Sequence, residues 1–180
     1  MRTAEEMAEF CLQNNTGSGT SRSWTLKHFG TIEKQLQNDE EVLFAFVGLH
    51  NYQSLTVHNN NFAYALTNKR FIMGQKKMMG ENIQIVLRKN LNDVTKSTGM
   101  LTGILTFDTI KETFNVRCSK DEINSIYDAI TEILFSTHEP TQMPMQDDKD
   151  KFAELKKYKE LLDLGIIDQA EFDAKKIELL

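Results

Sequence analysis

The 180-residue sequence predicts an α+β fold in which seven short antiparallel strands curl into a barrel or two bent sheets. A C-terminal helix caps these strands, helices precede them, and a helical hairpin ends the chain. Two observations carry the prediction. Apolar residues alternate with a period of two through the middle of the chain, where polar turns separate short runs. A strongly amphipathic helical pattern follows the last of these runs.

The first 40 residues predict two helices. An apolar stripe at helical spacing covers residues 4–12 and ends at the polar run of residues 14–21. Residues 29–36 show a second, shorter stripe, for which Asn38 and Asp39 provide the stop. The first helix needs an apolar surface to cover.

Seven strands follow, and the second and third form a hairpin around a tight turn at Asn68 and Lys69. The strands are expected at residues 42–49, 62–67, 70–75, 83–87, 91–96, 101–107 and 114–118.

The clearest helical signal of the chain begins at Ser119. Ser119 and Glu122 have capping-box spacing, in which the hydroxyl and the carboxylate accept hydrogen bonds from backbone donors of the first turn. Apolar residues then recur at helical spacing from Ile123 to Leu134. On an open barrel this helix would cover the inward-facing Phe and Ile side chains that water otherwise reaches.

A linker divides the chain. Both prolines, Pro140 and Pro144, lie in residues 138–148, which lack apolar periodicity. We therefore distinguish an N-terminal helix with a flexible loop (1–24), a main domain (25–137), the linker (138–148) and a helical-hairpin tail (149–180). Isolated helices of the tail's length are marginal in water, so the tail must dock on another surface.

Several segments carry a family resemblance. In the main domain these are residues 39–46 (DEEVLFAF), 65–72 (ALTNKRFI), 103–107 (GILTF) and 121–130 (DEINSIYDAI). They resemble bacterial pleckstrin-homology (PH) domains of the YokE-like group. Residues 155–179 (LKKYKELLDLGIIDQAEFDAKKIEL) resemble a SHOCT (short C-terminal) domain. The resemblance implies a non-catalytic module whose tail is an oligomerisation or partner-binding element.

Composition excludes several classes of protein. The 21 Lys and Arg against 26 Asp and Glu give a formal charge of −5, which argues against a general nucleic-acid binder. Cys11 and Cys118 lie too far apart in sequence for a local metal knuckle or a disulfide framework, which favours a reducing cytoplasm. The first 20 residues are too acidic for a secretory signal, and no apolar run approaches the ~20 residues of a membrane span. We expect a soluble, cytoplasmic protein.

The sequence shows no enzyme, cofactor or metal signature. Nucleophile-elbow, zinc-protease, Cys-x-x-Cys and Walker patterns do not occur, and residues 17–20 are expected to be an ordinary flexible linker. His50 and His58 flank one loop and are expected to be surface residues, because metal ligation needs converging rings and a third ligand. Cys118 is expected to be a small buried hydrophobic residue. We therefore expect no catalytic residue and no cofactor.

The hairpin at residues 75–81 is the candidate contact site of the main domain. Residues 42–68 contain no Lys or Arg, so the phosphate site that the PH resemblance implies at the first hairpin is missing. Residues 75–81 carry two cations and two methionines that a core does not need, and a solvated turn is the alternative. At ~1 kcal/mol each, the two lysines would not suffice as a sole membrane anchor. The candidate contact residues are Lys76, Lys77, Met78 and Met79.

The apolar side of the tail is the second candidate interface, since its charged residues form a solvated face. It either packs on its own barrel or binds another chain, and we favour association with a second copy or a partner protein. The sequence thus predicts a non-catalytic interaction and self-assembly module. The alternative is a peripheral lipid-surface or small-ligand binding protein that uses residues 75–81. The candidate tail residues are Phe152, Leu155, Leu161, Leu162, Ile166, Phe172 and Ile177.

Overall fold

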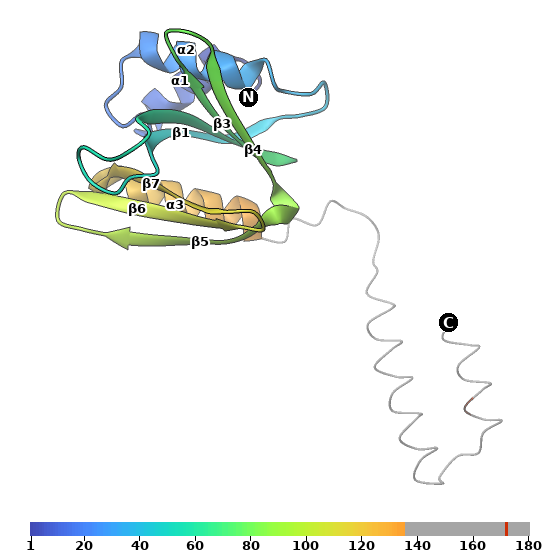
Figure 1. Cartoon of the computed structure of the whole chain (residues 1–180). Coiled ribbons are helices and arrows are strands. Elements are labelled where there is room, and N and C mark those ends of the chain that lie inside the picture. Colours follow the sequence, from blue (N-terminus) through green and yellow to red (C-terminus); the bar gives the residue numbers. More distant parts are fainter. Residues whose placement is uncertain (136–171, 173–180) are drawn as a thin grey trace. The chain divides into compact units, whose positions relative to one another are not determined.

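The computed structural model describes residues 1–135 and residue 172 of the chain. Two helices come first, seven strands follow, and a long helix ends the described domain (Figure 1). The elements are α1 (Ala4–Gln13), α2 (Arg22–Glu33), β1 (Val42–His50), β2 (Asn61–Thr67), β3 (Arg70–Lys76), β4 (Glu81–Leu87), the 3₁₀ turn η1 (Arg88–Asn90), β5 (Leu91–Thr98), β6 (Thr102–Thr109), β7 (Thr113–Ser119) and α3 (Lys120–Phe135).

The strands form one antiparallel sheet in the order β4-β3-β2-β1-β7-β6-β5. The predicted α+β class, the seven antiparallel strands and the helix after them are confirmed. β4 and β5 lie at the two ends of the sheet, and within residues 1–135 they do not pair with each other. The sheet is therefore bent and open, and backbone pairing does not close it into a full barrel.

An aromatic cluster fills the inside of the bend. Phe46, Tyr64 and Phe71 come from the first half of the sheet, and Phe107 and Phe114 come from the second. Ring centroids lie 4.6 Å apart for Phe46 and Tyr64, 5.1 Å for Phe71 and Phe107, and 5.0 Å for Phe107 and Phe114. Stacked rings at these distances add to the free energy gained by burial. The α3 residues packed into this core are Ile123, Ile126 and Ile130.

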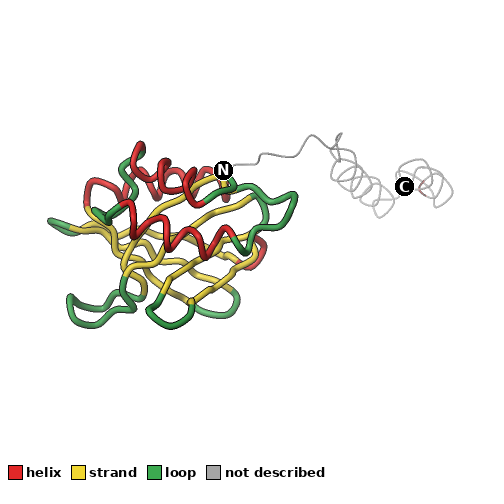
Figure 2. Tube along the Cα trace, turned by 90° about the horizontal axis from the view of Figure 1, so that it is seen from above, coloured by secondary structure: helices red, strands yellow, loops and turns green. Residues whose placement is uncertain are grey.

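A second core lies on the outer face of β1, β2 and β3, where α1 and α2 cover the strands. Figure 2 shows helices crossing over the strands in this way. Met7 and Cys11 of α1 and Ile32 of α2 are buried here against Val47 and Ile72. The predicted first helix therefore has the apolar surface that its stripe requires.

α2 begins earlier and ends earlier than the sequence predicted. Ser21 caps it, with its Oγ accepting a hydrogen bond from the N–H of Trp24, and the helix ends at Glu33, before Leu36. The apolar pattern did not reveal the first turns of α2, because the buried face of this helix carries the polar residues Thr25, His28 and Thr31. These polar groups bond to carbonyls of their own helix, which allows their burial.

Gly74 of β3 allows α2 to pack directly against the backbone of this strand. A Cβ atom at this position would lie 2.4 Å from Thr31 Oγ1 and 2.8 Å from Ile32 Cγ1. No side chain fits there without moving the helix away from the strand.

The two halves of the sheet share very little backbone pairing. β1 pairs with β7 only at Leu49 with Arg117 and at His50 with Val116. Just before these pairs, a Cβ on Gly48 would lie 2.4 Å from Val116 Cγ1, so the strands cross at a residue without a side chain. N-terminal to the crossing, residues 42–47 of β1 do not pair with β7. The backbone N–H and C=O groups on this edge of β1 therefore need other partners.

The N-terminal segment supplies these partners. Thr16 accepts a hydrogen bond from the N–H of Val47 at 2.8 Å through its carbonyl, and its hydroxyl donates to Ala45 O at 3.0 Å. At the start of the strand, the N–H of Val42 donates to Met1 O at 2.9 Å. Residues 1–24, which we separated from the main domain, thus belong to the compact unit Met1–Ser136.

A buried carboxylate, Glu122 of α3, ties this segment to the second half of the sheet. Glu122 is 3% exposed and accepts hydrogen bonds from the N–H of Ser18 at 2.8 Å and from the N–H of Ser119 at 3.2 Å. The Ser119 hydroxyl donates to the same carboxylate at 2.7 Å, so only the carboxylate half of the predicted capping box forms. The Ser18 hydroxyl lies 3.1 Å from Glu122 Oε2 and 2.8 Å from Val47 O, and donates to one of them at a time.

Replacing Glu122 should weaken the whole domain. Glu122→Ala leaves the N–H groups of Ser18 and Ser119 without their acceptor in a buried place, and we expect the free energy of unfolding to fall by about 3 kcal/mol. Urea denaturation measures this loss. Glu132→Ala, at an exposed carboxylate of the same helix, should change stability by less than about 0.5 kcal/mol. Equal losses for the two variants would contradict the bridging role of Glu122.

Candidate functional site

A hollow of about 620 Å³ opens between α2, the end of β1 and the β3–β4 hairpin. Its wall is aromatic, its floor carries amides, and its rim carries cations and a thioether. Because these residues come from separate segments, the hollow exists only in the folded chain. The lining residues are Trp24, His28, Leu49, Asn60, Asn61, Gln75, Lys76, Lys77 and Met78.

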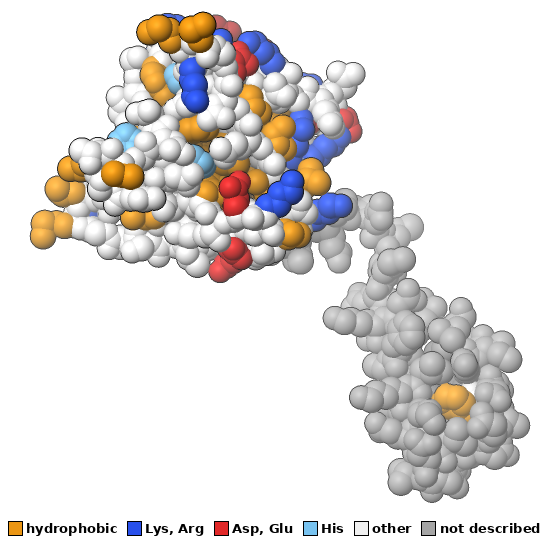
Figure 3. Space-filling view, in the orientation of Figure 1, with side chains coloured by type: hydrophobic (Ala, Val, Ile, Leu, Met, Phe, Trp, Pro, Cys, Tyr) orange, Lys and Arg blue, Asp and Glu red, His pale blue; other side chains and the backbone are white. Residues whose placement is uncertain are grey.

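The hairpin tip stands out from the body of the protein. The N–H of Lys77 donates to Gly80 O at 3.1 Å, and Gly80 takes a φ of 87°, which glycine adopts without strain. Met78 and Met79 lie between Lys77 and Gly80, and they are 102% and 90% exposed, respectively. Figure 3 shows hydrophobic side chains at the upper rim of the molecule, over this hairpin, with a Lys or Arg side chain just below them.

The two lysines of the hairpin differ in their surroundings. Lys76 lies 3.3 Å from Glu81, which also pairs with Lys34 at 2.7 Å. Hydrogen bonds from Lys34 and then Lys76 lower the pKa of Glu81, so this carboxylate is charged at neutral pH and offsets part of the Lys76 charge. Lys77 is exposed and has no acidic partner within residues 1–135.

The aromatic wall of the hollow is a stacked pair, Trp24 and His28. Their ring centroids lie 3.4 Å apart with planes at 12°, and His28 Nδ1 lies 2.8 Å from Trp24 O. Burial lowers the pKa of His28, and the charge of Lys27 lowers it further, against the opposing effect of the bond to Trp24 O. The wall is therefore neutral at physiological pH.

Gln75 fixes the hairpin to the loop between β1 and β2. Its Nε2 donates to Asn59 O at 2.9 Å and to Asn61 O at 3.1 Å. The side chain is buried, so these bonds are shielded from water. The β3–β4 hairpin is thus fixed at its base, and its tip is exposed.

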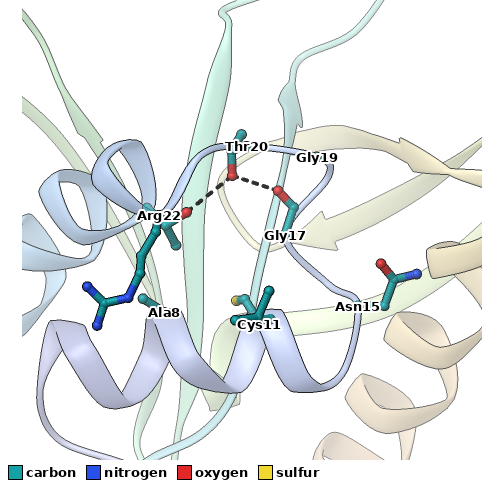
Figure 4. A pocket seen from close by; sticks show the side chains of 9 residues that line it. Ala8, Cys11, Asn15, Gly17, Gly19, Thr20 and Arg22 are labelled. Atoms are coloured by element: carbon teal, nitrogen blue, oxygen red, sulfur yellow. Dashed lines mark hydrogen bonds between the residues drawn. The ribbon is translucent and has the colours of Figure 1, made fainter.

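A smaller cavity of about 150 Å³ lies between α1 and the start of α2 (Figure 4). Ala8 and Cys11 on α1 face the loop of Gly17 and Thr20, whose hydroxyl donates to Gly17 O at 2.7 Å. Burial, with repulsion from the Glu122 carboxylate, raises the pKa of the Cys11 thiol to about 12. Cys11 is therefore a neutral thiol and not a nucleophile at neutral pH.

His50 does not lie on the surface, contrary to our expectation. β1 continues to this residue, so its ring enters the aromatic core, with Nδ1 3.0 Å from Tyr64 Oη and the ring 4.6 Å from that of Phe62. His58 stays exposed and bonds within its own loop, to Leu55 O at 3.2 Å. The two rings bind separate partners, and no group of three potential metal ligands occurs in the described part of the chain.

Cys118 is buried, as the sequence predicted, with its Sγ 3.9 Å from Val47 O. Burial raises the pKa of this thiol, and the Glu122 carboxylate raises it further. Across residues 1–135, no helix combines the length and the apolar character needed to cross a membrane.

The four candidate contact residues of the hairpin fall into two groups. Lys76, Lys77 and Met78 line the hollow, and Met79 extends from the tip. The sequence missed the opposite wall, because Trp24 and His28 lie some fifty residues away and no local pattern connects them with the hairpin. Of the candidate tail interface, only Phe172 is described, as a helical and partly buried residue, and the others lie outside the described residues.

Comparison with known families matches residues 36–132 to the bacterial PH domain family. The chain belongs to this family. The PH match spans all seven strands and most of α3, but α1 and α2, which supply Trp24 and His28, precede it. It ends before residues 155–179, so the SHOCT resemblance of that segment stays a prediction. No curated protein matches the chain.

His50 gives the PH domain a measurable pH dependence. Burial lowers the pKa of His50 to about 4, whereas an unfolded chain binds this proton near pH 6.5. Between these values the unfolded state holds more protons, so stability rises with pH, by about 2 kcal/mol from about pH 5 to about pH 7. Urea denaturation at both pH values measures the difference.

His50→Gln should remove this part of the pH dependence, and His58→Gln, at an exposed ring, should leave it unchanged. The same slope in wild type and His50→Gln would show that His50 titrates normally in the folded protein.

Proposed function

We propose that this bacterial PH domain is a non-catalytic interaction module that docks on anionic lipid surfaces through its β3–β4 hairpin. The exposure of Met78 and Met79 at a tip flanked by Lys76 and Lys77 carries the proposal. Apolar side chains at a tip can enter the boundary between headgroups and acyl chains. The cations just behind them remain level with the headgroup phosphates.

The energies support a reversible attachment. Burying a methionine side chain contributes about 2 kcal/mol, and each lysine near an anionic surface contributes about 1 kcal/mol. Lys76 contributes less than Lys77, because Glu81 shares its charge. The two lysines alone do not hold the domain on the membrane, and the two methionines supply the additional binding free energy.

The hollow behind the tip supports the same orientation. When the tip is inserted, Trp24 and the amides of Asn60 and Asn61 come to the level of the headgroups. Indole rings favour this level, and amide groups can donate to phosphate oxygens. Trp24 is the single tryptophan of the chain, so its fluorescence reports on this contact without a label.

The predicted tail gives the proposed module a second contact surface. Residues 149–180 carry an apolar face at helical spacing that two short helices cannot bury alone. Association with a second copy or a partner through this face is the self-assembly part of the proposal.

Co-sedimentation with vesicles of phosphatidylglycerol and phosphatidylcholine tests the lipid contact. We expect binding that weakens as salt rises, with a blue shift of Trp24 emission, and little binding to phosphatidylcholine alone. Lys76→Glu with Lys77→Glu should lower the partition constant by more than about tenfold. Met78→Ser with Met79→Ser should lower it at every salt concentration, because the apolar contribution is not screened.

Met100→Ser with Leu101→Ser is the matched control. Both residues are exposed at the turn between β5 and β6, where residues 99–101 contain no cation. This variant should bind as wild type does. Absence of wild-type binding to anionic vesicles at low salt would overturn the proposal, and equal losses from both hairpins would remove its assignment to β3–β4.

A further inference from the structure

The outer edge of β4 exposes both backbone and apolar side chains. β4 ends the sheet, and within residues 1–135 no strand pairs with its outer side. Ile85 and Leu87 are 41% and 43% exposed, and Ile83 is partly buried. Their register opposite Gly74, Ile72 and Arg70 of β3 places these three side chains on the face that α2 covers further in.

The hydrogen-bond pattern shows which backbone groups are free. The N–H of Lys77 donates to Gly80 O at one end of the hairpin, and the N–H of Arg88 donates to Lys69 O at the other. Bonded pairs alternate along an antiparallel ladder, so the even-numbered residues of β4 bond to β3. The N–H and C=O groups of Glu81, Ile83, Ile85 and Leu87 therefore point outward.

The other edges of the sheet are protected. The N-terminal segment covers β1 beyond its crossing with β7, through Thr16 and Met1. β5 has a register shift between Leu91 and Asp93, and its exposed residues are polar or charged. Bulges and charges are the usual means of preventing strand association, and the seven residues of β4 have no bulge and only Glu81 as a charge.

We propose that β4 pairs antiparallel with β4 of a second copy of this chain, about a two-fold axis at Gln84. In this register Ile83 of each copy lies opposite Ile85 of the other, and Glu81 lies opposite Leu87. These are the residues with free backbone groups, so the outward N–H and C=O groups of both strands find partners together. The apolar side chains then form one continuous stripe across the two-fold axis.

Charge complementarity favours a second copy over an unrelated strand. β4 begins at Glu81, and its other end is followed by the exposed Lys89, whereas the Arg88 side chain donates to Asn68 O and Ile133 O of its own copy. Antiparallel pairing brings the acidic end of each strand to the basic end of the other, whereas parallel pairing would place like charges together. The two hairpin tips point in opposite directions, so pairing leaves Met78 and Met79 exposed and does not depend on the lipid contact.

The mass of the full chain in solution, from light scattering after size exclusion, is the first test. We expect at least twice 20.7 kDa for the wild type, and half of the wild-type mass for Ile85→Lys, which places two cations near the axis. Ile110→Lys, at an exposed isoleucine of the turn between β6 and β7, should remain dimeric. Circular dichroism should show that both variants are folded.

Disulfide trapping tests the register itself. Gln84 faces its own copy as a non-bonded pair, with Cα atoms about 4.5 Å apart, which is within disulfide range. Gln84→Cys should therefore give a covalent dimer on oxidation. Asn82→Cys should not, because the two copies of residue 82 would be more than about 12 Å apart. Cys11 and Cys118 are buried and stay out of the reaction.

A monomeric wild type would overturn the proposal, and so would a dimer that persists in Ile85→Lys and is not trapped by Gln84→Cys. Trapping of Asn82→Cys as efficient as that of Gln84→Cys would overturn the register centred on Gln84.

Discussion

The bridge between Glu122 and Ser18 is the contact on which the rest of the domain depends. The two halves of the sheet share only two residue pairs, at Leu49 and His50, so backbone pairing alone does not hold them around the aromatic core. Thr16 and Ser18 form hydrogen bonds with the part of the β1 edge that does not pair with β7. Glu122 accepts hydrogen bonds from the N–H groups of both Ser18 and Ser119. A buried carboxylate with several donors is strongly stabilised where it lies, and it fixes α3 to the first half of the sheet.

This bridge makes the N-terminal segment part of the PH domain in a physical sense. The family match begins at residue 36, after α1 and α2. Yet these helices cover the outer face of β1, β2 and β3, and Trp24 and His28 form one wall of the hollow behind the hairpin. The surface of this protein is therefore composite, because the segment that matches the family carries Lys76 and Lys77 and the preceding helices supply the aromatic wall. A PH domain with other residues before it would present a different hollow.

Local patterns predicted much of this fold and little of its site. The seven strands followed from alternation with a period of two, and α3 followed from its isoleucines, because each pattern reports which face is buried. α2 was placed too late because its buried face carries Thr25 and His28, whose hydrogen bonds to their own helix are invisible to an apolar period. His50 was expected on the surface because a polar residue at a strand end gives no sign of the rings around it. The pairing of Trp24 with the hairpin is purely tertiary, so no local pattern encodes it.

The contact between Ser18 and Glu122 joins residues 104 positions apart, and this separation has a consequence for synthesis. Ser18 emerges from the ribosome about a hundred residues before Glu122, so it has no acceptor on α3 until that helix has been made. α1 can form early, but the loop after it must wait for both the β1 edge and the carboxylate of α3. Closing such distant contacts is slow compared with forming hairpins. During that interval the aromatic core also lacks the isoleucines of α3 that pack into it, so its apolar side chains are exposed to misassembly with other nascent chains until α3 is complete.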